Sequence, residues 1–428
     1  MFMKKTLVIA YYWPPAGGPG VQRWLKFTKY LPDFDVDPIV YVPENPNYPI
    51  VDNSLIDEVP KDLTILKQPI KEPYRLAKIF SGGSSNTISK GIIPQSKKQS
   101  LLTKLLLYIR GNFFIPDARK NWVKPSVNYL TNYIKTHKIE TVITTGPPHS
   151  LHLIGLGLKN NLNITWIADF RDPWTTIGYH KKLRLNAVSK KRHKQLEKKV
   201  LNEADSIVVT SFVTKAEFEN ITQKPIHVIT NGYDYEKVEK PSLDSRFSIS
   251  HIGTLLSDRN PEVLWEVLRE LTKENNTFKS FLQINLVGNV SKEIIESLES
   301  FELTQFLNLK GYVSHEEAIK YQRKSQLLLL IEIDSEETRC IVPGKLFEYM
   351  VSERPIIALG PENSDVEQLI SETNTGDYFT YSDRKILKET ILKHFDSFRA
   401  NELKSHAIGL QQYSRKALTK RLAELILK

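Results

Sequence analysis

Short runs of β-branched and other apolar residues alternate with helical patterns along most of the chain, and this alternation constrains the fold most. The first series of apolar runs comprises residues 6–10, 37–42, 141–145, 164–170, 206–211 and 226–230. Helical patterns lie between several of these runs, at 21–31, 120–136, 150–160 and 189–203. Such an alternation is typical of a parallel sheet that is covered by helices on both faces.

A polar stretch without periodicity, "NGYDYEKVEKPSLDSR" at 231–246, reads as a linker. A second series of apolar runs then follows, at 247–253, 281–288, 307–313, 327–333 and 355–360. Its helical patterns cover 261–275, 315–325, 344–352 and 363–372. We therefore expect an α/β protein with two Rossmann-like, doubly wound domains, residues 1–232 with an insert at 71–118 and residues 247–406.

Ligands of doubly wound sheets bind beyond the carboxyl ends of the strands, so we expect the two domains to face a shared cleft. Closure of this cleft on a ligand would use hinges near 231–246 and near residue 407, where the last amphipathic helix is expected to begin.

The composition is that of an ordinary globular protein, with 40% hydrophobic and 25% charged residues. The single cysteine, Cys340, excludes an internal disulfide and fits a reducing compartment. The apolar run at 6–10 is short and lacks a small-residue cleavage site, which favours a buried strand over a signal peptide. No stretch approaches the length of a membrane span. The sequence predicts a cytoplasmic protein.

The net charge of +10 is concentrated in two places. In residues 181–200, Lys and Arg far outnumber a single Glu, and residues 96–114 mix Lys97, Lys98, Lys104 and Arg110 with many apolar residues. This combination suits peripheral contact with an anionic membrane. A solvated helix face is the alternative interpretation. Nucleic-acid binding is disfavoured because no recognised motif accompanies the charge.

The loop after the first strand, "YYWPPAGGPGVQR" at 11–23, is rich in glycine. Gly17 and Gly18 would let the backbone approach a ligand, and the helix from about Val21 would present free N–H groups to an anion. Arg23 would add a bidentate contact to phosphate or carboxylate. The spacing is not the dinucleotide fingerprint, and Pro19 removes a donor. A turn that only packs helix on strand is the alternative.

Five stretches in a definite order carry a family resemblance: "YYWPPAGGPGVQR", "EKKVLNEADSIVVTS", "VITNGYD", "SHIGTLLSDRN" and "PGKLFEYM". With "LKGYVSHEE" at 309–317, they resemble GT-B glycosyltransferases, most closely the retaining bacterial enzymes of family 4. The resemblance spans essentially the whole chain outside 71–118. It implies a terminal helix, residues 407–428, that crosses back onto the first domain.

The resemblance also implies the activity. The protein would move a sugar from a nucleotide-diphosphate sugar to a sugar or lipid-linked acceptor, with retention, in cell-surface polysaccharide or glycoconjugate biosynthesis. It would be a hexosyltransferase that requires no metal or other cofactor. No Cys or His spacing indicates a metal site, and "DVD" at 35–37 lies at the wrong edge of the sheet.

The donor side of the site follows from the same resemblance. Glu348 would accept hydrogen bonds from the ribose hydroxyls, because a carboxylate is an acceptor only. Arg259 and Lys345 would neutralise the diphosphate leaving group. Further donor contacts are predicted for Gly253, Thr254, Tyr312, Val313 and Gly344, and in the first domain for Gly17, Gly18 and Arg23. Many family members carry a second glutamate eight positions before Glu348, where this chain has Cys340; Glu336 or Glu337 would have to replace it.

On the acceptor side, the resemblance places His149 near the transferred sugar, with Asp172 as a second catalytic candidate. His152 is expected to be structural. Acceptor contacts are predicted for Trp13, Asp169, Arg171 and Trp174. An internal Asp–Arg–Asp salt-bridge cluster and two core tryptophans are the alternatives for these residues. A nucleotide-sugar epimerase of the same fold and a non-catalytic binding partner are the alternative functions.

Overall fold

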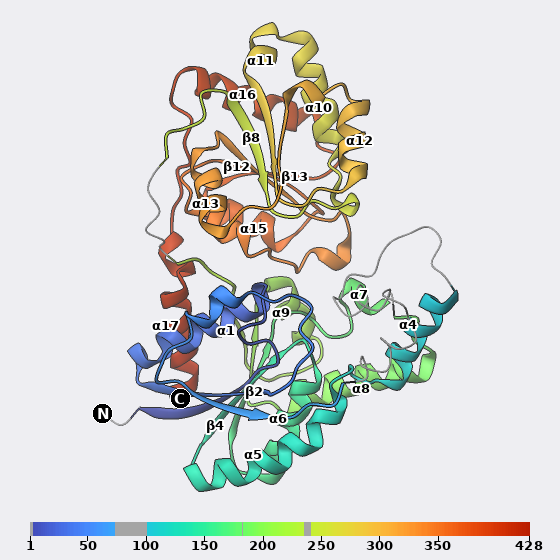
Figure 1. The fold of residues 1–428 in the computed structure, drawn as a ribbon, viewed down its shortest axis with the longest axis vertical. Helices are drawn as coiled ribbons and strands as arrows, with labels where there is room; N and C mark the ends of the chain where they lie inside the picture. Colours follow the sequence, from blue (N-terminus) through green and yellow to red (C-terminus); the bar gives the residue numbers. More distant parts are fainter. Residues whose placement is uncertain (1–2, 73–100, 182, 235–240) are drawn as a thin grey trace. The chain divides into compact units, whose positions relative to one another are not determined.

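The computed structural model describes residues 3–72, 101–181, 183–234 and 241–428 (Figure 1). The chain forms two compact units, of which the first comprises Met1–Asn231 and Arg415–Lys428 and the second Gly232–Ser414. Parts of the predicted insert at 71–118 and of the predicted linker at 231–246 lie outside the described residues, as do Lys97 and Lys98. The cleft between the domains and its closure stay predictions.

The first unit contains a seven-stranded parallel sheet with the strand order β3-β2-β1-β4-β5-β6-β7. Its strands are β1 (Lys4–Ile9), β2 (Val36–Pro43), β3 (Thr64–Gln68), β4 (Thr141–Gly146), β5 (Thr165–Phe170), β6 (Ser206–Val209) and β7 (Ile226–Val228). Its helices are α1 (Pro19–Tyr30), α4 (Leu101–Phe113), α5 (Val123–His137), α6 (Ser150–Asn161), α7 (Gly178–Lys181), α8 (Ala187–Glu203), α9 (Phe212–Glu219) and α17 (Arg415–Leu427).

Alternate residues of β1 face the two layers of helices. Val8 packs with Trp24 of α1 and Leu418 of α17 on one face, whereas Leu7 packs with Leu130 of α5 and other residues on the opposite face. The apolar run at the start of the sequence is therefore a central, fully buried strand, as predicted.

The second unit contains a six-stranded parallel sheet with the order β10-β9-β8-β11-β12-β13. Its strands are β8 (Phe247–Ile252), β9 (Leu282–Val287), β10 (Leu307–Lys310), β11 (Leu327–Ile331), β12 (Ile356–Leu359) and β13 (Gly376–Phe379). Its helices are α10 (Glu262–Glu274), α11 (Asn276–Phe281), α12 (Lys292–Ser300), α13 (His315–Lys324), α14 (Lys345–Met350), α15 (Asp365–Thr373) and α16 (Arg384–Arg399). The predicted pair of doubly wound domains is confirmed.

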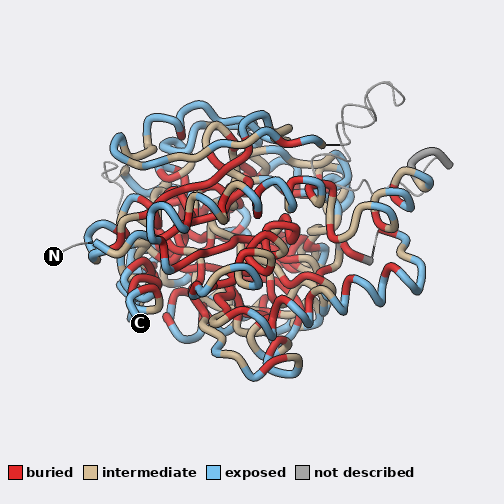
Figure 2. The backbone as a smooth tube through the Cα atoms, turned by 90° about the horizontal axis from the view of Figure 1, so that it is seen from below, coloured by how far each residue is buried: buried red, intermediate tan, exposed pale blue. Residues whose placement is uncertain are grey.

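The terminal helix α17 belongs to the first unit, as predicted, but it begins at Arg415 and not near residue 407. Leu418, Leu422 and Ile426 are buried in the core of the first unit. Burial follows the strands of each sheet, and the outer faces of the helices are exposed (Figure 2). Within the described ranges, no helix has the length and apolar character needed to span a membrane.

Candidate functional site

Lys345, the first residue of α14, reaches the carboxyl end of β8. Its Nζ lies 3.1 Å from Nε2 of His251 and 3.0 Å from the carbonyl oxygen of Ile252. Gly253 follows with a φ of +120°, and a Cβ at this position would lie 3.0 Å from Nζ of Lys345. A glycine is required here because the backbone is left-handed and passes close to the ammonium group.

Arg259 supplies a second positive charge near this strand end, from the short turn Ser257–Arg259. Burial, followed by the charge of Arg259, lowers the pKa of Lys345 to about 7, while Glu348 acts in the opposite direction. Among the described residues, neither Arg259 nor Lys345 forms a salt bridge with a carboxylate. Two partly buried cations without such a partner favour an anionic ligand.

Glu348 lies one turn further along α14 and keeps part of its carboxylate accessible. Its Oε2 accepts a hydrogen bond from Nε2 of Gln322 at 2.9 Å, and its Oε1 lies 4.0 Å from Nε2 of His315. The Glu348 side chain is 29% exposed. One carboxylate oxygen is thus held by α13, and the other can receive a donor from a ligand. Gln322 was not predicted as a site residue, because no motif in "YQRKSQ" distinguishes it from other polar residues of a helix.

Glu332 is a further acidic residue at this sheet edge that the sequence analysis missed, since "LLLLIEI" reads only as a buried strand. Its carboxylate accepts hydrogen bonds from Oγ of Ser364 at 2.9 Å and from the hydroxyl of Tyr378 at 2.8 Å. Burial raises the pKa of Glu332 to about 8, although these hydrogen bonds and the charge of Arg259 lower it. Glu332 is therefore largely protonated at neutral pH.

The remaining donor-side candidates differ in exposure. Tyr312 is 94% exposed and available for stacking, and Val313 is half-buried. Thr254 is exposed, and the space around the α-carbon of Gly344 is open. Their contacts with a donor stay predictions.

In the first unit, Arg23 and Asp169 form a buried ion pair. The distance from Nη2 of Arg23 to Oδ1 of Asp169 is 2.9 Å, and the two side chains are 2% and 1% exposed. Asp169 also accepts hydrogen bonds from Nε1 of Trp24 and Oγ1 of Thr145. Nη1 of Arg23 donates to the carbonyl oxygen of Thr230. The two side chains neutralise each other inside the domain and tie α1 to β5, as the alternative of an internal salt bridge expects. The ligand contacts predicted for Arg23 and Asp169 stay predictions.

Trp13 and Trp174 are also buried, which favours the alternative of two core tryptophans, and their contacts with an acceptor stay predictions. Trp174 stacks on the ring of His149 with a centroid distance of 4.9 Å and donates its Nε1 hydrogen to Nδ1 of His193 at 3.1 Å. Both tryptophans belong to hydrophobic clusters of the first unit.

His149 immediately precedes α6, beyond the end of β4. Neither of its ring nitrogens has a hydrogen-bond partner within the described residues, and burial holds its pKa well below the ordinary value. The ring is therefore neutral at physiological pH. Asp172 is half-buried, and burial raises its pKa. The contacts predicted between these two residues and a sugar stay predictions.

The glycines of the first loop serve different purposes. A Cβ on Gly17 would lie 2.9 Å from Cγ2 of Ile50, so protein and not ligand occupies that space. Gly18 has a φ of +98° with no atom within 4 Å of an added Cβ, so its side remains open. A Cβ on Gly20 would collide with Nη1 of Arg171. The loop therefore makes room for the guanidinium of Arg171, which also donates to the carbonyl oxygen of Pro147.

Known proteins of similar sequence or structure indicate which family this chain resembles. Residues 93–237 match the family model of Glycosyltransferase Family 4. A search of curated protein sequences gave no match. The sucrose-phosphate synthase of Thermosynechococcus elongatus has a similar structure, with a TM-score of 0.60 and 12% identity over 99% of this chain and 98% of the other. The chain has the GT-B fold and resembles the family 4 glycosyltransferases.

Two other solved structures resemble this chain over almost its whole length. A variant of S. aureus TarM, in complex with fondaparinux, α-GlcNAc-glycerol and UDP, has a TM-score of 0.57 and 13% identity over 100% of each chain. A putative UDP-N-acetylglucosamine 2-epimerase from Listeria monocytogenes has a TM-score of 0.55 and 12% identity over 99% of this chain and 96% of the other.

This GT-B protein departs from the family pattern at Cys340, which is buried with its Sγ 3.8 Å from the carbonyl oxygen of Glu337. Glu336 pairs with Arg339 at 3.6 Å and is 85% exposed. The replacement of the family glutamate by Glu336 or Glu337 stays a prediction.

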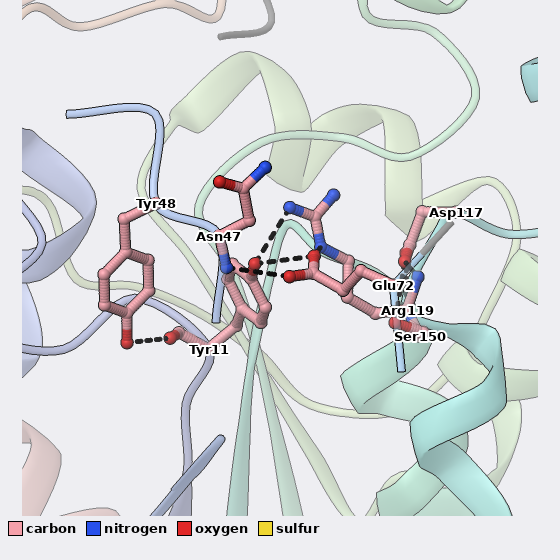
Figure 3. A network of polar contacts seen from close by, with 7 residues as sticks. All are labelled: Tyr11, Asn47, Tyr48, Glu72, Asp117, Arg119 and Ser150. Atoms are coloured by element: carbon pink, nitrogen blue, oxygen red, sulfur yellow. Dashed lines mark hydrogen bonds and ion pairs between the residues drawn. The ribbon is translucent and has the colours of Figure 1, made fainter. Parts of the chain in front are cut away.

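A polar network holds the carboxyl edge of the first sheet (Figure 3). Nε of Arg119 pairs with Glu72 at 3.0 Å, and the hydroxyl of Tyr11 donates to the same carboxylate at 2.8 Å. Asp117 accepts hydrogen bonds from the backbone N–H and the hydroxyl of Ser150, the first residue of α6, both at 2.8 Å. The network fixes the end of β1 and the start of α6, the two segments that flank Tyr12 and His149.

Proposed function

We propose that this protein transfers a sugar from a nucleotide-diphosphate sugar to a saccharide or lipid-linked acceptor, with retention of the anomeric configuration. The observation that carries the proposal is the pair of cations Arg259 and Lys345 at the carboxyl end of β8, neither of which has a salt-bridge partner in the part of the chain that the structure describes. A departing diphosphate needs positive charge that is already in place, and these two side chains supply it.

Three further observations support the donor class. Glu348 offers one carboxylate oxygen to a ribose hydroxyl. Tyr312 is exposed for contact with a base. The S. aureus TarM variant of the same fold is in complex with UDP and a GlcNAc-bearing glycerol. By analogy with that protein, we propose a hexosyl donor. The expected role in cell-surface polysaccharide or glycoconjugate synthesis is also part of the proposal.

A panel of nucleotide sugars, with and without candidate acceptors, tests this proposal. We expect slow release of the nucleoside diphosphate from one donor, faster release with an acceptor, and a product that keeps the donor's anomeric configuration by NMR. Arg259→Gln should suppress this release. Interconversion of the sugar without an acceptor would identify an epimerase instead. If the protein binds a donor but turns it over under no condition, it is a non-catalytic binding partner and the proposal is overturned.

We also propose that transfer requires no divalent metal, because Arg259 and Lys345 can neutralise the leaving diphosphate. The initial rate should be the same with and without EDTA. A rate that falls with EDTA and returns with added Mg²⁺ would contradict this part of the proposal.

A further inference from the structure

Helix α4 carries a row of exposed apolar side chains. Leu105 is 54% exposed and Phe113 is 62% exposed, and Tyr108 and Ile109 lie between them on the same helix. The spacing 105, 108, 109 and 113 keeps these side chains on one face of the helix. A single exposed apolar residue is ordinary, but a contiguous row marks an interaction surface.

The start of α8 is fixed beside the end of α4. The side-chain carbonyl of Asn112 accepts a hydrogen bond from the backbone N–H of Asn186 at 2.9 Å, and its amide group donates to the carbonyl oxygen of Arg184 at 3.2 Å. Gly111 lies so close to Leu183 that an added Cβ would be 2.6 Å from the Leu183 carbonyl oxygen. The two helices are adjacent (Figure 1). Val188, 77% exposed, adds an apolar side chain at the start of α8.

The exposed side of α8 is strongly basic. Lys190, Lys191, Lys194 and Lys198 line a shallow groove along this helix. Among the described residues, none of these four lysines forms a salt bridge. Glu197 is the one carboxylate between Lys190 and Lys198, and it is buried and bonded to Thr175. The lysines are therefore available to an external polyanion.

We propose that this α4–α8 surface, formed by the apolar row of α4 and the lysines of α8, docks the protein on an anionic lipid membrane. Such a membrane matches both halves of the surface. Apolar side chains enter the boundary between headgroups and acyl chains, and lysines interact with anionic headgroups. A nucleic acid or a soluble acidic protein would occupy the lysines but would leave the apolar row of α4 without a partner.

Sedimentation with lipid vesicles tests the proposal on the full chain. The protein should bind vesicles of phosphatidylcholine mixed with phosphatidylglycerol and should not bind vesicles of phosphatidylcholine alone. Replacing Lys190, Lys194 and Lys198 together by Gln should weaken binding on the order of 100-fold, since each surface lysine contributes about tenfold or less. The double variant Leu105→Ser and Phe113→Ser should weaken binding at least about tenfold.

A matched control replaces three exposed lysines of the second unit, Lys279, Lys385 and Lys404, by Gln and should bind vesicles like the unmodified protein. All variants should keep their thermal unfolding midpoint, because the altered side chains are exposed. Equal binding to neutral vesicles, or wild-type binding by both the lysine and the apolar variants, would overturn the proposal. Loss of heparin binding in the lysine variant, with no vesicle binding by any protein, would identify a soluble polyanion instead. The assay involves no nucleotide sugar, so its outcome is independent of the proposed transferase activity.

Discussion

The ammonium group of Lys345 lies 3.1 Å from Nε2 of His251, whose Nδ1 faces the carbonyl oxygen of Leu329 at 3.0 Å. Since a carbonyl can only accept, Nδ1 carries the hydrogen and Nε2 accepts one from the ammonium. Burial and the nearby charge of Lys345 hold the pKa of His251 well below its usual value, so the ring stays neutral. Lys345 is thereby held in place by two acceptors that carry no negative charge.

Binding of a nucleoside diphosphate should weaken as the pH rises above about 7. The pKa of Lys345 is lowered to about 7 in the free protein, so the side chain is charged below this pH and neutral above it. A bound diphosphate raises this pKa, and binding then takes up a proton. The affinity should fall up to about tenfold per pH unit between 7 and 9. Calorimetry in buffers of different ionisation enthalpy measures the proton uptake, and Lys345→Met should remove it. An uptake that persists in this variant would assign it to another group.

Glu348→Gln should weaken donor binding by roughly 1–3 kcal/mol, the range for a hydrogen bond to a charged group. The fold should remain stable, because the Glu348 side chain is 29% exposed and a glutamine can still bond to Gln322. Thermal shift with a nucleoside diphosphate series measures the change. Glu302→Gln is the matched control, since Glu302 is 66% exposed, pairs with Lys273 and is not among the predicted donor contacts. Equal donor affinities in the two variants would remove Glu348 from the site.

Glu332 should make the protein less stable as the pH rises from about 4.5 to about 8. Its pKa is 4.5 in an unfolded chain and about 8 in the folded protein, so in this window the native state binds the extra proton and the free energy of unfolding falls with pH. The contribution is at most about 1.4 kcal/mol per pH unit. Glu332→Gln should therefore gain stability relative to the unmodified protein as the pH rises from 5 to 8, by urea titration. A constant difference across this range would mean that Glu332 does not titrate there.

The sequence predicted those parts of the fold that rest on continuous apolar runs. Residues 327–331 are all buried, and they lie within the apolar run predicted at 327–333. The strands β3 and β13, which the sequence analysis did not predict, lie at the edges of their sheets and are largely half-exposed. An edge strand has less surface to bury, so it needs no apolar run and gives a weaker signal.

A site residue can be predicted from the sequence when its chemical type and its position at the edge of the sheet together determine its role. Lys345 is an example. A residue's role cannot be predicted in this way when its partner lies far away in the sequence. Arg23 and Asp169 are 146 positions apart, and only the three-dimensional structure pairs them. Gly20 was recognised as part of a glycine loop, but its neighbour Arg171 could not be inferred from spacing.

Breaking the Arg23–Asp169 pair should destabilise the protein strongly. Arg23→Met leaves a carboxylate buried without its counter-ion, and such losses amount to about 3–5 kcal/mol. The surface pair Lys292–Glu296 provides a control, since its side chains are 85% and 54% exposed and Lys292→Met should leave the free energy of unfolding nearly unchanged. Urea unfolding measures both variants. A small loss for Arg23→Met, with activity abolished, would instead support the prediction that Arg23 binds a ligand.

Gly20→Ala should impair the use of the acceptor by displacing Arg171. The added Cβ would collide with Nη1 of Arg171, and this guanidinium also lies 5.8 Å from the ring centroid of Tyr12. If Arg171 contacts the acceptor, KM for the acceptor should rise about tenfold or more, because a hydrogen bond from a charged group contributes about 1.5–3 kcal/mol.

Donor affinity should not change, since the predicted donor contacts with Arg259, Lys345 and Glu348 lie in the second unit. Gly409→Ala is the control: its φ of +67° makes the substitution strained, but no predicted site residue is displaced, so it should lower stability and leave KM unchanged. In an Arg171→Gln background, Gly20→Ala should have little additional effect on KM. Full additivity of the two substitutions, or an unchanged KM in both single variants, would show that Arg171 has only a structural role.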